Sequence, residues 1–114
     1  MRCFERFAQL SAPRQALVRL CQSIDYGQVL DLHISTDGEP SFSPEPQLIV
    51  EVKLDADRTP RQETQLTDFT LCGEVLRLLD LIDSIRTGCI EKIEIRAGLP
   101  KRVLIRASLR EVVR

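Results

Sequence analysis

The chain has 114 residues, of which 43% are hydrophobic and 29% charged, and its formal net charge at pH 7 is −1. These values are typical of a single soluble globular domain. No apolar stretch approaches the ~20 residues that a membrane-spanning helix needs, and the first residues lack the pattern of a signal peptide. We therefore expect a cytoplasmic protein with no membrane partner.

The content of aromatic residues, cysteine and histidine narrows the classes of binding site. Four Phe, one Tyr and no Trp offer few faces for stacking nucleic-acid bases or sugars. The four cysteines are widely spaced and form no C-x-x-C motif, and there is one histidine. We expect free thiols in a reducing compartment, no metal site and no cofactor.

The first segment, residues 3–24, has apolar side chains at helical spacing, which predicts helix. Ser11 and Pro13 are residues that favour helix starts, so a short helix followed by a longer one from about residue 12 is expected. Gly27 is predicted to end the longer helix, in the positive-φ conformation common after helices.

Two strands are predicted next. Residues 30–35 alternate Leu30, Leu32 and Ile34 with polar side chains, a pattern of a half-buried strand. Residues 36–47 contain turn signals that include Gly38. In residues 48–54 the side chains of Leu48, Val50, Val52 and Leu54 alternate with Ile49, Glu51 and Lys53, so a second strand with the first set facing the core is expected.

After a polar linker at 56–63, the same order of elements is predicted again. Residues 71–85 form a helix with a wide apolar stripe, which indicates extensive burial, and Gly88 ends it. Strands at about 90–96 and 102–109 follow, joined by residues 97–101, which include Gly98.

This order reflects an internal sequence match. Leu20, Ile24, Gly27 and Val29 correspond to residues 61 positions later, and similar apolar pairs extend the match on both sides. We interpret the chain as one domain, residues 1–114, made of two repeats at about 3–55 and 64–110. The predicted fold is α+β: a tandem helix–strand–strand repeat forming a four-stranded antiparallel sheet with two main helices on one face. The alternative is a swapped dimer, in which each copy pairs with a copy from another chain.

The two copies carry opposite charge. Residues 20–57 contain eight acids and one base, whereas residues 86–114 contain eight bases and three acids. Three explanations remain open: neutralisation between neighbouring hairpins, pairing of the two lobes between chains, and binding of an anionic partner such as nucleic acid. The predicted basic patch is Lys92, Arg96, Arg102, Arg106 and Arg110, and the predicted acidic patch is Asp31, Glu51 and Asp55.

Two further features are candidates for contacts with a partner. Aligning the second strands requires an offset of 55, so copy one has six extra residues in its hairpin loop, Ser41–Pro46. The extra residues form either a contact segment or a tolerated insertion. At the same offset, Ile49 and Leu104 occupy equivalent outward positions, and we predict both as dimer contacts on the open face of the sheet.

Evidence for an active site is weak. His33 points outward beside Asp31 and has no nucleophile placed near it, and Cys89 follows a predicted helix C-terminus, which does not activate a thiol. Phosphate-binding and hydrolase motifs are absent from the sequence. We expect no catalytic residue and no enzymatic activity.

The segments Ser23–Val29 and Ser84–Ile90, each followed by an alternating strand and a Gly turn, resemble the core of small YezD-type bacterial proteins. Those are single helix-plus-hairpin chains of about half this length, and the family supplies no catalytic residue. The resemblance thus implies the same helix-plus-hairpin unit used twice.

The leading hypothesis from the sequence is a small, non-enzymatic interaction or oligomerisation module, with a regulatory or adaptor role, whose partner is itself or another protein. The first alternative is a nucleic-acid-binding regulator that uses the basic last hairpin. The second is a small-ligand-binding domain or enzyme with a site between the helices and the sheet.

Overall fold

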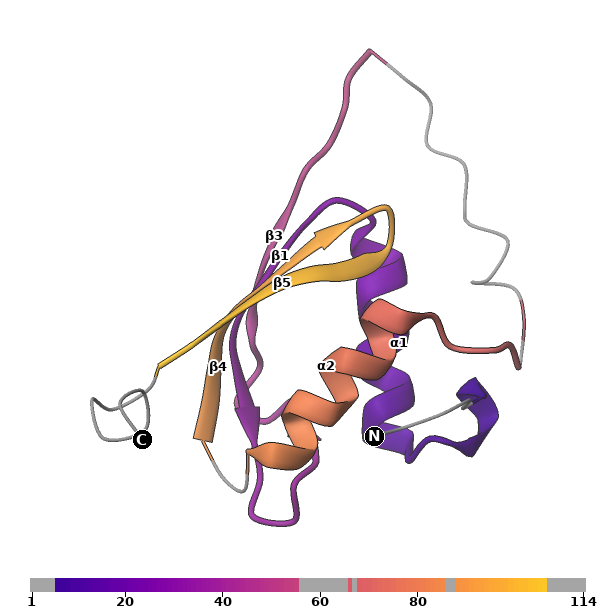
Figure 1. The fold of residues 1–114 in the computed structure, drawn as a ribbon. Coiled ribbons are helices and arrows are strands. Elements are labelled where there is room, and N and C mark those ends of the chain that lie inside the picture. Colours follow the sequence, from indigo (N-terminus) through magenta and orange to yellow (C-terminus); the bar gives the residue numbers. More distant parts are fainter. Residues whose placement is uncertain (1–5, 56–65, 67, 86–87, 107–114) are drawn as a thin grey trace.

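The structure is a computed structural model that describes residues 6–55, 66, 68–85 and 88–106. It contains two α-helices packed on one face of an antiparallel sheet, which is the predicted α+β class (Figure 1). The predicted linker at 56–63 and Arg110 lie outside the described residues. None of the helices in the described part is long and apolar enough to cross a membrane.

The helices begin where the sequence favours it. A 3-10 helix, η1 (Phe7–Gln9), precedes α1 (Ala12–Ile24), which has Ser11 at its N-cap and Pro13 in its first turn. The expected break before residue 12 is therefore confirmed. The second helix, α2 (Gly73–Ser84), starts 61 residues after α1 and carries Glu74 in its first turn.

Strands β1 (Gly27–Ile34) and β4 (Gly88–Arg96) form the centre of the sheet and also start 61 residues apart. They run antiparallel, and the two residue numbers in every β1–β4 pair add up to 122. Strand β5 (Leu99–Ile105) pairs with the other side of β4. The outer side of β1 pairs with two short strands, β2 (Pro40–Ser41) and β3 (Gln47–Val50).

Both central strands depart from simple alternation. Val29 and Leu32 are both buried although they are three positions apart, and Asp31 between them has φ of 58°. Ile90 and Ile93 repeat this spacing beside a register shift between β4 and β5. Bulges of this kind change which face a side chain points to. The expectation that Leu30 shares the buried face with Leu32 is therefore wrong, and Leu30 is only half-buried.

The core lies between the sheet and the two helices. One buried cluster joins side chains of α1 and α2 to those of the central strands, and a second surrounds the N-terminal halves of the helices. Seven pairs of apolar residues 61 apart are buried in both halves of the described chain: Leu10/Leu71, Leu17/Leu78, Val18/Leu79, Cys21/Ile82, Val29/Ile90, Leu32/Ile93 and Ile34/Ile95.

The outer strand of the first hairpin differs from the prediction. The hairpin turns at residues 35–39, where the backbone N–H of Ser35 bonds to the carbonyl of Glu39, and the extra residues lie between β2 and β3. Val29 pairs with Leu48 and Ile90 pairs with Ile105, so the strands match at an offset of 57 rather than 55. The insertion is therefore four residues long and interrupts an edge strand. Phe42 within it packs against the core.

The predicted burial of the second strand is also wrong. Pairing ends at Val50 within β3, and Leu48, Val50, Val52 and Leu54 are all exposed rather than in the core. The helices cover the central strands β1 and β4, and β3 lies beyond the area that the helices cover. In Figure 1 the segment after β3 leaves the sheet and rises away from the body of the molecule.

Candidate functional site

The face of the sheet opposite the helices carries most of the residues that the sequence singled out. Glu94 lies between Gln28 on one side and Arg102 on the other, and Lys92 lies between Leu30 and Leu104. Acidic, basic and apolar side chains therefore alternate across the open face. None of the β1–β4 register pairs matches an acid with a base, so the two central strands do not neutralise each other by direct pairing.

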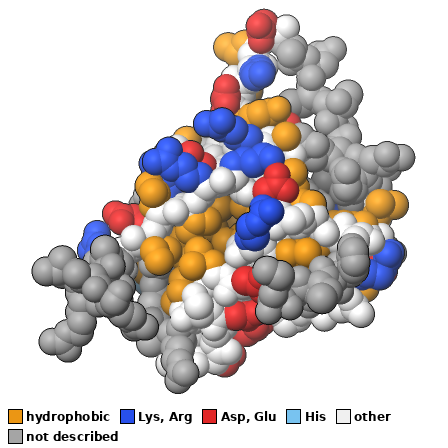
Figure 2. Space-filling view, viewed as in Figure 1, with side chains coloured by type: hydrophobic (Ala, Val, Ile, Leu, Met, Phe, Trp, Pro, Cys, Tyr) orange, Lys and Arg blue, Asp and Glu red, His pale blue; other side chains and the backbone are white. Residues whose placement is uncertain are grey.

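The basic residues of the last hairpin are interspersed with acids. Arg106 forms an ion pair of 3.5 Å with Glu91, Arg102 lies opposite Glu94, and Arg96 lies opposite Leu99. Figure 2 shows Lys and Arg side chains over one end of the molecule with acidic side chains among them. In the described residues this arrangement is a mixed surface rather than a uniformly positive one.

The acidic residues lie apart from one another. Asp31 is in the bulge of β1, next to Cys89, whereas Glu51 and Asp55 are beyond the end of β3. The backbone N–H of Glu51 donates to the carbonyl of Tyr26 at 2.8 Å, and Lys53 Nζ lies 5.2 Å from the centre of the Tyr26 ring. These contacts hold the start of the segment 51–55, which we call the arm.

Ile49 and Leu104 both lie on the open face, where Ile49 is 50% exposed and Leu104 is 37% exposed. Ile49 lies opposite Gln28 on one edge strand, and Leu104 lies opposite Lys92 on the other. The register therefore does not place them at equivalent positions, because their equivalence depended on the offset of 55.

The edge formed by β3 and the arm has the largest row of exposed apolar side chains in the described chain. Val52 is 60% exposed and Leu54 is 95% exposed. Leu48 and Val50 precede them within β3, at the two-residue spacing that keeps side chains on one side of a strand, and Leu54 follows in a turn. Exposed apolar groups along a strand edge are characteristic of pairing surfaces.

The four predicted turn glycines have different roles. Gly38 and Gly98 have φ of 80° and 75° in the two hairpin turns, as a glycine turn requires. Gly27 is the first residue of β1 rather than a positive-φ helix end, because Asp25 has that conformation with φ of 64°. Gly88 begins β4.

Gly27 is needed for a close approach between strands. A Cβ atom at this position would lie 2.0 Å from the carbonyl oxygen of Ile49. The absence of a side chain thus lets β3 lie against β1.

The three cysteines that the structure describes and the histidine are not arranged as a catalytic site. Burial raises the pKa of the Cys21 thiol to about 12. Desolvation, helped by the Asp31 carboxylate, also raises the pKa of Cys89. His33 is exposed and lies opposite Cys89 in the register. Cys21, Cys72 and Cys89 are free thiols, and the described residues contain no group of three or more potential metal ligands.

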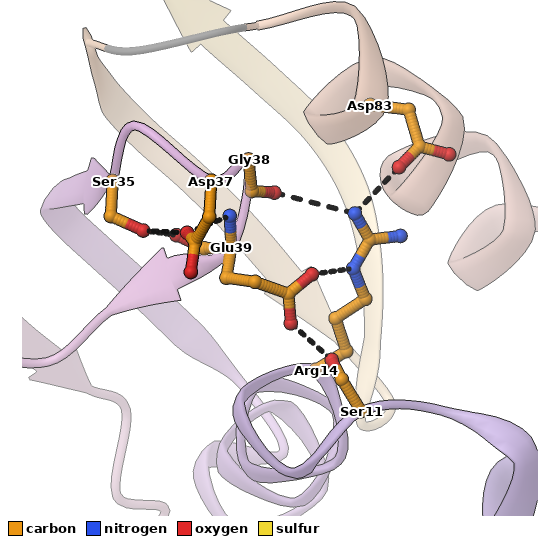
Figure 3. Close-up of polar contacts among 7 residues, drawn as sticks. All are labelled: Ser11, Arg14, Ser35, Asp37, Gly38, Glu39 and Asp83. Atoms are coloured by element: carbon orange, nitrogen blue, oxygen red, sulfur yellow. Dashed lines mark hydrogen bonds and ion pairs between the residues drawn. The ribbon is translucent and has the colours of Figure 1, made fainter.

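A polar cluster around the buried Arg14 side chain joins both helices to the first hairpin turn (Figure 3). Arg14, 9% exposed, forms ion pairs with Glu39 at 3.0 Å and Asp83 at 2.5 Å, and donates to the carbonyl of Gly38 at 3.3 Å. Ser11 Oγ donates to the second carboxylate oxygen of Glu39. We call this group of five residues the Arg14 cluster, and its contacts indicate a structural role.

The Arg14 cluster was missed in the sequence analysis, although a signal for it exists. Arg14 precedes Leu17, Val18 and Cys21 by three, four and seven positions, so it lies on the apolar stripe of its helix. A charged residue at such a position requires a partner. The sequence does not identify Glu39 and Asp83 as those partners, because they come from a turn and from the other helix.

Comparison with family models, curated proteins and solved structures finds no match to this chain. The resemblance to YezD-type proteins thus stays a prediction.

Proposed function

We propose that this chain is a small, non-enzymatic interaction module that works in the cytoplasm and associates with a second copy of itself through β3 and the arm. The observation that carries the proposal is the row of exposed apolar side chains along this edge, Leu48, Val50, Val52 and Leu54. Burial against an identical row would remove apolar surface of both copies from water.

The backbone of the edge supports pairing with another strand. Glu51 N–H bonds to Tyr26, and the carbonyl oxygen of Ile49 approaches Gly27, so both residues direct their backbone groups toward β1. In an antiparallel ladder these directions alternate along the strand. Val50 and Val52 therefore direct their N–H and C=O groups away from the sheet, where an added strand can bond to them.

Charge favours one register. An axis of two-fold symmetry through Val52 places Glu51 opposite Lys53 of the second copy. An axis through Glu51 or Lys53 would instead place two like charges opposite each other, which destabilises a strand pair. The antiparallel dimer centred on Val52 is thus the complementary one.

Sedimentation of the chain at concentrations up to high micromolar tests the proposal. We expect a concentration-dependent dimer that is abolished by Val52→Lys, since two lysines would meet on the axis. Leu104→Lys is the matched control, because it adds the same charge at an exposed apolar position on the opposite edge strand. A strict monomer in both low and high salt would refute self-association, and loss of the dimer only in the Leu104 variant would refute this interface.

Exchange of the two charges tests the register. Glu51→Lys and Lys53→Glu should each weaken the dimer, because each puts like charges opposite each other. The double variant should restore it, since the pair is then reversed. Equal dimerisation of all three variants would show that Glu51 and Lys53 do not face each other.

Nucleic-acid binding has less support from the geometry. In the described part of the last hairpin, Lys101 forms an ion pair with Glu74 and Arg106 with Glu91. Phosphate contacts would have to compete with these acids. Absence of any shift in a gel-shift series at low salt would remove this alternative.

A further inference from the structure

A cavity of about 190 Å³ lies between the two helices and the turn that joins β4 to β5. Its wall is mainly apolar, with contributions from both core clusters. The leucine and valine side chains of the wall are Leu17, Val18, Leu71, Val75, Leu78, Leu79 and Leu99.

One polar side chain of the wall stands out. Gln22 is 8% exposed, and its Oε1 accepts a hydrogen bond of 2.9 Å from Arg19. The Arg19 guanidinium is itself held over the Phe7 ring, 4.3 Å from its centre. The hydrogen bond from Arg19 thus fixes the orientation of the Gln22 amide. Within the described chain, Gln22 Nε2 donates no hydrogen bond. Buried amide donors normally have a partner.

The other half of the molecule shows how such a space is filled. Each residue of the Arg14 cluster has a counterpart in the other half of the chain. The offset is 61 residues for the positions in and next to the helices and 60 for those in the hairpin turns, and every counterpart lines the cavity. Val75 stands in place of Arg14, Leu99 in place of Glu39, and Gln22 in place of Asp83. The guanidinium of Arg14 and its ion pairs occupy one site, whereas short apolar side chains leave the other open.

The size and lining of the cavity define a ligand class. Engineered apolar cavities of about 150 Å³ bind benzene, so this space fits an apolar molecule of roughly six carbons. We propose that the cavity binds a small aliphatic molecule with one carbonyl oxygen, which accepts a hydrogen bond from Gln22 Nε2 while the chain lies against the aliphatic wall. This inference is independent of self-association, because the cavity does not involve β3 or the arm.

Titration with methyl butyl ketone and with hexane, followed by NMR, tests the site. We expect saturable shifts of the methyl signals of Leu17, Val18 and Val75 and of the Gln22 side-chain amide, with the ketone bound about 5–10-fold more tightly because of its hydrogen bond. Bound ketone should also slow alkylation of Cys72, which lines the cavity, but not of Cys89, which does not. Absence of saturable shifts with either molecule would overturn the proposal.

Two variants separate shape from hydrogen bonding. Gln22→Leu should retain hexane binding and lose the preference for the ketone, and an unchanged preference would overturn the role of the amide. Val75→Phe should abolish binding of both molecules by filling the space, while Leu104→Phe, on the open face of the sheet, should leave binding unchanged. Retained binding in the folded Val75 variant would place the ligand elsewhere.

Discussion

Arg14 holds a positive charge where little water reaches it, so its two carboxylate partners replace solvation. We predict that Arg14→Met, which keeps the length of the side chain, lowers the free energy of unfolding by about 2 kcal/mol, since Glu39 and Asp83 lose their shared cation. Urea denaturation measures this change.

Lys101→Met is the matched control for Arg14. Lys101 also joins a strand to a helix, through Glu74, but both side chains are more exposed than that of Arg14. Exposed pairs contribute about 0–1 kcal/mol. Equal losses of unfolding free energy in the two variants would show that the burial of Arg14 does not strengthen its ion pairs.

Asp68 provides a residue-scale test of acid sensitivity. Hydrogen bonds from the Arg6 side chain and the Ala8 backbone N–H hold the pKa of Asp68 below its ordinary value of 3.8. Because the folded pKa is lowered, the stabilisation is complete above the ordinary value and is lost as the pH falls through the folded one.

We predict that NMR titration finds the pKa of Asp68 below 3.8 in the unaltered chain. In Arg6→Gln it should move up toward the ordinary value, since the largest cause of the shift is removed. An identical titration curve in the two proteins would contradict the assignment.

At the scale of elements, the contact between β1 and β3 depends on a missing side chain. We predict that Gly27→Ala destabilises the fold by about 1–3 kcal/mol, because a methyl group there would overlap the Ile49 carbonyl oxygen and force β3 away. Chemical denaturation measures the loss, and amide exchange should show it concentrated in residues 47–50.

Gly73→Ala is the opposite case. At the start of α2 an added Cβ meets only the flexible end of Arg77, at 3.5 Å. Alanine there should raise the free energy of unfolding by about 0.5 kcal/mol, since it restricts the unfolded chain and favours helix. A similar loss of stability in Gly73→Ala and Gly27→Ala would mean that steric overlap with Ile49 does not explain the effect at Gly27.

The edge strand also shows why periodicity alone misplaced some residues. Alternation from Leu48 to Leu54 predicts a strand with one apolar side, but the strand ends at Val50 and Leu54 lies in a turn, and the alternation does not say what covers that side. In the structure the helices cover the central strands, and the apolar side of the arm faces solvent. The same limit applies to Leu30. A bulge in β1 changes the face of the sheet to which its side chain points, and no residue type in the sequence signals that bulge.

At the scale of the whole molecule, much of the fold could be predicted because it follows from apolar spacing. Matches such as Leu17/Leu78 and Val29/Ile90 located the helices, the central strands and the core, and all four of these residues are buried. The sites were harder to predict. The Arg14 cluster and the cavity each depend on segments far apart in sequence that meet only after folding.

The β1–β4 register has a consequence for how the two halves relate. Because the numbers in every pair have the same sum, adding 61 to one number and subtracting 61 from the other gives another pair of the same ladder: Gly27–Ile95 becomes Ile34–Gly88, and Gln28–Glu94 becomes His33–Cys89. A strand at the position of β1 could thus pair antiparallel, in the same register, with a second strand of identical sequence at the position of β4. A chain with two identical halves would keep this ladder, and selection could then alter one half at a time.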